Sequence, residues 1–227
     1  MHNLEQRIDL EIERRSLLKH KFYQLWLEGK LNLYHLQGYS KEYFQLVKAV
    51  PGLVQNICSY SDEDACSLRS AMKENLKEES EHVELWVKFA ATLGVSSDDL
   101  VKHISSDGTN NAVSSLVQLT KLSFEQGAAA MYAYEKQLPD ISRSKIEGLK
   151  KFYGLNKNNH DDDDDAAEYF KVHEQVDVRH AALWRNILQR VSREDFDYVF
   201  NAAAKSLDAQ NRLLDSVYER YIGPIAC

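Results

Sequence analysis

Apolar residues recur at intervals of three and four along nearly the whole chain, and this spacing constrains the fold more than any other feature. Leu4, Ile8 and Ile12 near the start are one example, and the chain shows this spacing rather than the alternation of half-buried strands. Such spacing places side chains on one face of a helix, because an α-helix has about 3.6 residues per turn. The sequence therefore predicts an all-α fold.

Few residues interrupt this helical pattern. The 227 residues include three prolines and nine glycines, the residues that most often end helices. We expect a loop at 105–111, which reads SSDGTNN, and another at 156–165, which contains five consecutive aspartates. The pattern predicts its longer helices at about 4–28, 32–50, 112–137 and 193–221.

Charge and cysteine content exclude several classes of protein. The net charge of −7 argues against nucleic-acid binding, because phosphate recognition requires a basic surface. There is no run of about 18 apolar residues and no basic start before an apolar core, so we expect neither a membrane span nor a secretory signal. Cys58, Cys66 and Cys227 are odd in number and lack a zinc-type spacing. Reduced thiols, and hence a cytoplasmic location, are expected.

One polar stripe stands out in the segment 169–184, YFKVHEQVDVRHAALW. His173, Asp177 and His180 recur at intervals of four and three, which on a helix places all three within about 60° of one another. Apolar neighbours predict that part of this helix is buried, where an unpaired carboxylate is unfavourable. A metal ion would compensate, because imidazole nitrogen and carboxylate oxygen suit iron, manganese or zinc. An ion pair with Arg179 is the structural alternative.

Two further groups of candidate ligands lie on other expected helices. Glu78 and Glu79 precede His82 by four and three residues, so either carboxylate can share a metal with it, although a solvated acidic face is the alternative. Glu135 is the one acidic residue on a turn that otherwise looks buried, where it must be paired, protonated or metal-bound. Together with the stripe, six nitrogen and oxygen ligands suit two iron-type ions bridged by carboxylates.

Four segments resemble a known family. They read HKFYQLWLEGKL at 20–31, EESEHVELW at 78–86, AMYAYEKQLP at 130–139 and HEQVDVRHAALW at 173–184. They are similar to the heme-oxygenase-like proteins that include thiaminase II and the pyrroloquinoline quinone synthesis protein C, and most similar to the chlamydial protein associating with death domains and its bacterial relatives. The resemblance implies one all-α, heme-oxygenase-like bundle of about seven to nine helices, spanning residues 1–227, with a dinuclear oxygenase site.

The activity implied by the resemblance is para-aminobenzoate synthesis for folate biosynthesis, in which the protein consumes its own side chains. Tyr23 matches the tyrosine that supplies the ring, Lys145 matches the amine donor, and Tyr43 matches an aromatic residue that would relay an electron. Two metal ions, iron or iron with manganese, would activate dioxygen with electrons from an external reductant. The ligands implied are Glu79, His82, Glu135, His173, Asp177 and His180.

One departure from the family pattern concerns the first ligand. The most similar relatives have a spacing of about seven residues between this glutamate and its histidine, whereas Glu79 precedes His82 by three. Seven residues end about 20° from a whole number of turns and three about 60°, so the loss of roughly one turn leaves both groups facing the same way. The choice between Glu78 and Glu79 stays open.

Other functions remain as alternatives. The same metals would serve an oxygenase that turns over a free amine or fatty acid, whereas a cofactor-free ring-closing enzyme of quinone biosynthesis would not need six clustered ligands. A thiaminase would need a nucleophilic cysteine in the middle of the bundle, and none lies between Cys66 and Cys227. Binding of host death domains is a further alternative, suggested by the family's namesake. A homodimer is compatible with the apolar residues of the last helix, Leu207, Leu213, Leu214 and Val217.

Overall fold

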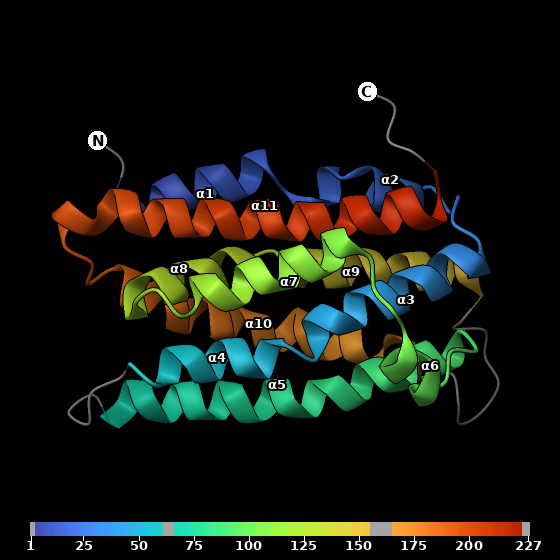
Figure 1. Ribbon diagram of the computed structural model, residues 1–227, viewed down its shortest axis with the longest axis horizontal. Coiled ribbons are helices and arrows are strands. Elements are labelled where there is room, and N and C mark those ends of the chain that lie inside the picture. The colour runs from blue at the N-terminus through green and yellow to red at the C-terminus, as the bar shows by residue number, and fades with distance from the viewer. Residues whose placement is uncertain (1–2, 61–65, 155–164, 224–227) are drawn as a thin grey trace.

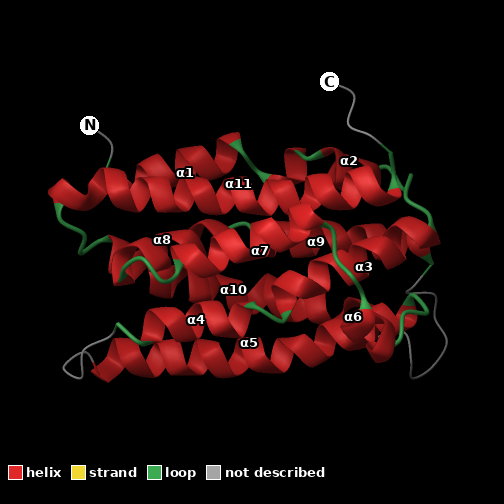
Figure 2. Ribbon diagram, viewed as in Figure 1, coloured by secondary structure: helices red, strands yellow, loops and turns green. Residues whose placement is uncertain are grey.

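The structure is a computed structural model that describes residues 3–60, 66–154 and 165–223, and these ranges contain helices but no strand (Figures 1 and 2). The expected all-α bundle is therefore confirmed. None of these helices is long and apolar enough to cross a membrane. The loop expected at 156–165 lies outside the described ranges except for its last residue.

The α-helices are α1 (Leu4–Arg14), α2 (Lys21–Leu27), α3 (Leu33–Val47), α4 (Val50–Cys58), α5 (Cys66–Thr92), α6 (Ser97–Lys102), α7 (Asp107–Leu119), α8 (Phe124–Glu135), α9 (Leu138–Gly148), α10 (Asp165–Leu188) and α11 (Phe196–Tyr221). There are also 3₁₀ turns at Leu17–Lys19 and Arg193–Asp195 and a π-helical turn at Leu149–Tyr153.

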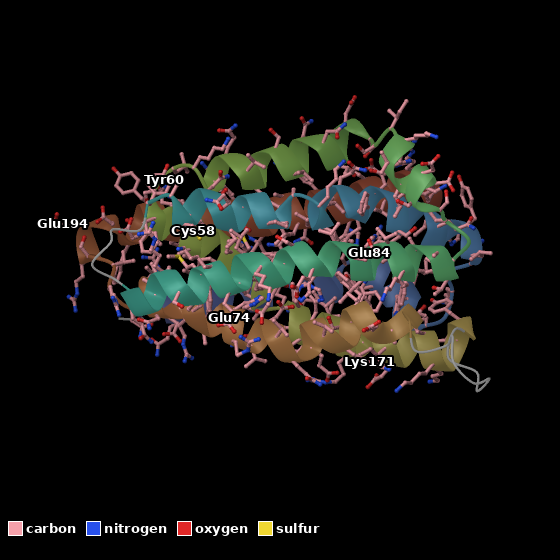
Figure 3. The ribbon with its side chains drawn as sticks, turned by 90° about the horizontal axis from the view of Figure 1, so that it is seen from below. Cys58, Tyr60, Glu74, Glu84, Lys171 and Glu194 are labelled. Carbon is pink, nitrogen blue, oxygen red and sulfur yellow. The ribbon has the colours of Figure 1, made fainter. Side chains whose placement is uncertain are left out.

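The helices lie roughly along one direction in stacked layers (Figure 1). α11, with α1 and α2 beside it, forms one outer layer, and α5 with α4 forms the opposite one. Between them, α10 packs against α5, α8 and α9. In Figure 3, α5 and α10 lie side by side, with Glu74 and Glu84 on α5 and Lys171 on α10. Inward-facing side chains of α5, α8 and α10 can therefore meet in the interior.

Polar caps and prolines determine where several helices begin. The side chains of Asn3 and Asn32 accept hydrogen bonds from backbone N–H groups in the first turns of α1 and α3. Pro51 and Pro139 lie in the first turns of α4 and α9, where the missing N–H removes no helical hydrogen bond. Each proline therefore helps to start a new helix as well as separating it from the one before.

Serines account for the main differences from the expected helices. The expected helix at 4–28 is split because the backbone of Ser16 is not helical. The one at 112–137 is split because Ser123 caps a new helix, α8. The loop expected at 105–111 is wrong as well, because its second serine caps α7. A serine hydroxyl bonds readily to nearby backbone N–H groups, so these serines begin helices that apolar spacing alone did not separate.

The interior contains three large aromatic anchors. Trp26, Trp86 and Trp184 come from α2, α5 and α10, and each is 0% exposed. The indole N–H of Trp86 donates to the backbone carbonyl of Ser40, which ties α5 to α3. A rigid, close-packed interior of this kind holds the polar side chains of α5, α8 and α10 in defined positions.

Candidate metal centre

Three helices bring the six predicted ligands into one interior region. α5 supplies two of them, α8 supplies one at its final residue, and α10 supplies three. None of the six residues is more than 5% exposed, although all are polar or ionisable. In chain order they are Glu79, His82, Glu135, His173, Asp177 and His180.

Five of these residues form two compact sets that share one carboxylate. The donor atoms of Glu79, His82 and His173 lie within 4.8 Å of one another, as do those of Glu79, Asp177 and His180. Oε1 of Glu79 lies 3.5 Å from Nδ1 of His82 and 3.2 Å from Nδ1 of His180. If each set held a cation, Glu79 would be shared by both, as in carboxylate-bridged sites of helical bundles.

Glu135 lies beside these sets but belongs to neither. Its Oε2 accepts a hydrogen bond from the indole N–H of Trp184, and its Oε1 is buried without a partner. Burial raises the pKa of Glu135 well above its usual value, and the nearby Glu79 and Asp177 raise it further, although His180 acts in the opposite direction. Without a cation, this carboxyl group favours its neutral form.

Unpaired polar atoms in this region fit the binding of a metal. A buried polar atom without a partner costs about 1–3 kcal/mol, and a metal ion would satisfy several of them at once. The amide of Asn75, one turn before Glu79, is also buried and unpaired. Nitrogen and carboxylate oxygen are donors that iron and manganese accept. Besides that amide, the unpaired atoms are Nδ1 of His82, Nδ1 of His180, both carboxylate oxygens of Asp177 and Oε1 of Glu135.

The backbone of α10 orients His173. Its Nδ1 lies 2.7 Å from the carbonyl oxygen of Tyr169, and its ring stacks on that of Tyr169 with centres 4.0 Å apart. A carbonyl only accepts hydrogen bonds, so Nδ1 carries the proton and Nε2 keeps the lone pair that binds a metal. Burial lowers the pKa of His173, which favours the neutral form required of a ligand.

Without a cation, a proton on His180 balances the buried carboxylates. Burial alone would lower the pKa of His180, but the nearby carboxylates of Asp177 and Glu79 raise it to about 11. Burial alone would raise the pKa of Glu79, but the nearby imidazoles of His180 and His82 hold it below its usual value. Burial raises the pKa of Asp177. Metal binding would therefore displace a proton from His180.

Glu78 and Glu79, between which the sequence did not choose, lie in different surroundings. Glu79 belongs to both sets, whereas Glu78 belongs to neither and forms an ion pair with Arg179 at 2.8 Å. This ion pair also bears on the alternative interpretation of the stripe on α10, in which Arg179 pairs with the stripe in place of a metal. Arg179 is engaged by Glu78, while both oxygens of Asp177 have no hydrogen-bond partner.

Tyr23 and Lys145 meet in an aromatic pocket beside His173. Lys145 is 1% exposed, and its Nζ lies 5.2 Å from the centre of the Tyr23 ring. A cavity of about 10 Å³, close to the size of one water molecule, is lined by Tyr23, Lys145 and His173 among others. Burial lowers the pKa of Lys145 well below its usual value, so the amine favours the neutral form.

Tyr39 connects these two residues, and sequence reasoning missed its role. The Lys145 ammonium or amine donates a hydrogen bond to the hydroxyl of Tyr39, whose side chain is in turn hydrogen-bonded to Tyr23. Tyr43, the predicted relay, is also near, with its ring centre 5.2 Å from that of Tyr39. The four-residue spacing of Tyr39 and Tyr43 places both on one face of α3, and this is the signal that could have indicated Tyr39.

Residues 41–211 match a protein family described as iron-containing redox enzymes. The chain belongs to this family. It is 34% identical to a 4-aminobenzoate synthase of Chlamydia pneumoniae, over 92% of each chain. It is 31% identical to a 4-aminobenzoate synthase of Nitrosomonas europaea, over 100% of this chain and 95% of the relative. This iron-containing redox family confirms the resemblance drawn from the motifs and the prediction of an oxidoreductase with a metal cofactor.

Solved structures agree on the fold of this family member. A TenA homologue of Pseudomonas syringae pv. tomato superposes with a TM-score of 0.82 at 16% identity, covering 95% of this chain and 93% of that one. A domain with a heme oxygenase-like fold from Shewanella denitrificans gives 0.79 at 19% identity, covering 96% and 91%. A CADD-like protein of Nostoc punctiforme gives 0.77 at 16% identity, covering 97% of each chain. The expected heme-oxygenase-like fold is confirmed.

Proposed function

We propose that this family member makes 4-aminobenzoate from its own Tyr23, with Lys145 as the source of the amino nitrogen. The names of its relatives support the product. The observation that carries the proposal is the position of Lys145, whose Nζ lies 5.2 Å from the Tyr23 ring centre in a buried pocket that His173 also lines. Ring, amine and candidate ligand therefore share one enclosed space.

The metals of the proposed site would be held by His173 and the other candidate ligands of α5 and α10. When bound, a pair of iron ions, or iron with manganese, would supply the activation of dioxygen, with electrons from an external reductant. The protein's own contribution is to hold the ligands rigidly and to exclude water. The proposed ligands are Glu79, His82, His173, Asp177 and His180, with Glu135 beside them.

Lys145 is prepared for a reaction with an aromatic ring by its surroundings. A neutral amine has the lone pair that a nucleophile requires, and burial favours this form by lowering the pKa of Lys145. The hydrogen bond to Tyr39 holds the amine in place. Its Nζ also lies 5.0 Å from the ring centre of Trp26 and 5.1 Å from that of Phe170, so aromatic walls separate it from solvent.

Tyr43 is the proposed electron relay between the metals and the ring that is consumed. Its ring lies 5.1 Å from that of Trp86 and 5.2 Å from that of Tyr39, which contacts Tyr23. Burial raises the pKa of Tyr43 to about 12, and the nearby carboxylates of Asp177 and Glu79 contribute. The neutral phenol is therefore its stable form.

Isotope labelling tests this proposal. Protein made with ring-labelled tyrosine, loaded with Fe(II) and exposed to air and a reductant, should release labelled 4-aminobenzoate. The peptide containing Tyr23 should lose the mass of the ring and of Cβ, because Cβ would become the carboxyl carbon of the product. Tyr23→Phe should abolish the product. Tyr132→Phe is the matched control, because Tyr132 is also buried but donates its hydroxyl hydrogen bond to Asp9, away from Lys145. Unchanged product from Tyr23→Phe would refute self-consumption.

Labelled lysine tests the second half of the proposal. Protein made with lysine carrying nitrogen-15 on its side chain should transfer that label to the product, and Lys145→Met should prevent labelled product from forming. An unlabelled amino group in 4-aminobenzoate released by the wild type would show that the nitrogen has another source.

A second candidate is an oxygenase that turns over a free small molecule. The observation that favours it is a surface pocket of about 390 Å³ between α8, α9 and α10 that reaches the proposed ligand Asp177. Many turnovers per chain with an added amine or fatty acid would support this candidate, whereas at most one product per chain supports self-consumption. A homodimer and the binding of death domains stay predictions, but the apolar residues of α11 that suggested a dimer are buried inside the chain and do not favour one. These residues are Leu207, Leu213, Leu214 and Val217. The pocket is lined by Tyr132, Lys136, Pro139, Asp140, Arg143, Asp177, Val178, Ala181, Ala182 and Arg185.

A further inference from the structure

Glu78 is held between two consecutive residues of α10. Its Oε2 lies 2.7 Å from Nε2 of His180, and its Oε1 accepts a hydrogen bond of 2.8 Å from the guanidinium group of Arg179. Both carboxylate oxygens are therefore engaged from the neighbouring helix. Glu78 lies next in sequence to Glu79, but only Glu79 lies in the sets of candidate ligands.

This contact decides which nitrogen of His180 faces the centre. A carboxylate paired with Arg179 accepts hydrogen bonds and donates none, so Nε2 of His180 carries the proton that it shares with Glu78. Nδ1 is then the nitrogen available to a cation. It lies 3.2 Å from Oε1 of Glu79 and 3.5 Å from Oδ1 of Asp177, inside the second set.

His173 and His180 are oriented by different means. His173 is held by the carbonyl of Tyr169, a neutral acceptor one turn away on its own helix. His180 is held by a carboxylate on another helix, so its orientation depends on how α5 packs against α10. A charged acceptor behind an imidazole also makes it a better metal ligand, and loss of such a partner typically lowers metal affinity 10- to 100-fold.

We propose that Glu78 is a positioning residue and not a ligand. Together with Arg179, it holds His180 with Nδ1 toward a cation shared with Glu79 and Asp177, and it raises the affinity of that one metal position. The inference rests on the metal centre in the proposed function but not on the fate of Tyr23.

Metal binding by the metal-free, full-length protein tests the inference. Calorimetric titration with Fe(II) under anaerobic conditions should show two binding events in the wild type. Glu78→Ala should weaken one event about 10- to 100-fold and leave the other unchanged, with both positions still filled at high metal concentration. Glu78→Gln should lose less metal affinity, because its amide oxygen still accepts a hydrogen bond from His180. Arg179→Ala should weaken the same event more mildly.

A matched control separates this role from general damage. Glu81 is exposed on the same helix and forms a long ion pair of 3.7 Å with Lys77, so Glu81→Gln should change neither event. Metal-free melting temperatures of the Glu78 variants within a few degrees of the wild type would show that the fold is intact. A merely structural role would lower this temperature without singling out one binding event.

Three results would overturn the inference. If both Glu78 variants bind one metal fewer at saturation, Glu78 is itself a ligand. If both binding events are unchanged, it has no positioning role. If the wild type binds no metal, the inference falls together with the proposed centre. By contrast, two normal binding events that depend on Glu78, without any 4-aminobenzoate, would uphold the inference and refute the proposed reaction.

Discussion

Gly148 lies directly against the indole of Trp26, and a side chain at this glycine would have no room. A Cβ atom built on Gly148 would lie 2.2 Å from Nε1 of Trp26. This contact joins α9 to α2, and each helix carries one of the proposed reacting residues three positions earlier, Lys145 on α9 and Tyr23 on α2. The close approach of these two helices is therefore what brings the amine to the ring.

Gly148→Ala should disturb this arrangement, and Gly52→Ala should not. The rigid, fully buried indole of Trp26 cannot move aside, so we expect Gly148→Ala to lower the free energy of unfolding by about 1–3 kcal/mol. Gly52 is helical, with nothing within 4 Å of an added Cβ, so Gly52→Ala should be neutral or stabilise by up to about 1 kcal/mol. Urea denaturation of the metal-free proteins measures both. Equal effects of the two substitutions would contradict the packing argument.

Lys145 should make stability depend on pH in a recognisable way. Burial lowers its folded-state pKa well below 10.5, so between these two values the unfolded chain binds a proton that the folded protein does not. Stability contributed by this residue therefore rises with pH up to about 10.5, by at most about 1.4 kcal/mol per pH unit. Lys145→Met keeps a side chain of similar length and removes the effect.

Urea denaturation of the metal-free wild type and Lys145→Met at pH 7, 8 and 9 provides the measurement. The difference in free energy of unfolding should change steadily in favour of the wild type as pH rises. Parallel pH profiles would show that Lys145 stays protonated in the folded protein.

The shared carboxylate should matter more for metal binding than an unshared one. Glu79 lies in both sets of candidate ligands and Asp177 in one. We expect Fe(II), added without oxygen at about 100 times its dissociation constant, to stabilise the wild type by about 2.7 kcal/mol for each occupied position. Asp177→Asn should lose about half of the total gain and Glu79→Gln nearly all of it.

Thermal melts with and without Fe(II) compare these variants. Asp140→Asn is the control, because Asp140 is exposed and pairs with Arg143 on the surface. Fe(II) should stabilise this variant as much as it stabilises the wild type. If Fe(II) stabilised Glu79→Gln as much as the wild type, Glu79 would not be shared by two cations.

Glu42 should stabilise the packing of α3 against α11 at neutral pH. This carboxylate is 0% exposed and accepts hydrogen bonds from Arg220 at 2.6 Å and from the backbone N–H of Ser106 at 3.2 Å, and it pairs with His103 at 3.0 Å. Glu42→Gln should lower the free energy of unfolding at pH 7 by about 1.5–3 kcal/mol. Glu219→Gln, an exposed neighbour of Arg220, is the control and should have little effect.

The pH dependence of this difference follows from the pKa of Glu42. Burial alone would raise this pKa, but hydrogen bonds from Thr109, His103 and Ser106 hold it below 4.5. The stability that Glu42 contributes is therefore present above pH 4.5 and is lost as the pH falls through the folded-state pKa. Denaturation at pH 7, 5 and 4 should show the wild type and Glu42→Gln converging, whereas a constant difference would contradict an ionised Glu42.

Local patterns predicted the parts of the site that lie on one helix. His173, Asp177 and His180 form a stripe because side chains at intervals of four and three share a helix face, and this needs no knowledge of the rest of the fold. The choice between Glu78 and Glu79 could not be made in the same way. The two residues are adjacent on α5, and only the position of α10 shows that Glu78 pairs with Arg179.

The sequence alone determined that the chain is helical and which residues are able to bind metals, because helix periodicity and ligand chemistry are properties of short segments. Its resemblance to a family added the pairing of Tyr23 with Lys145. Only the tertiary structure decided that Tyr39 lies between them and that Glu79 joins two sets of candidate ligands. These relationships depend on contacts between helices distant in sequence, and such contacts are made by packing of the whole bundle rather than by any local pattern.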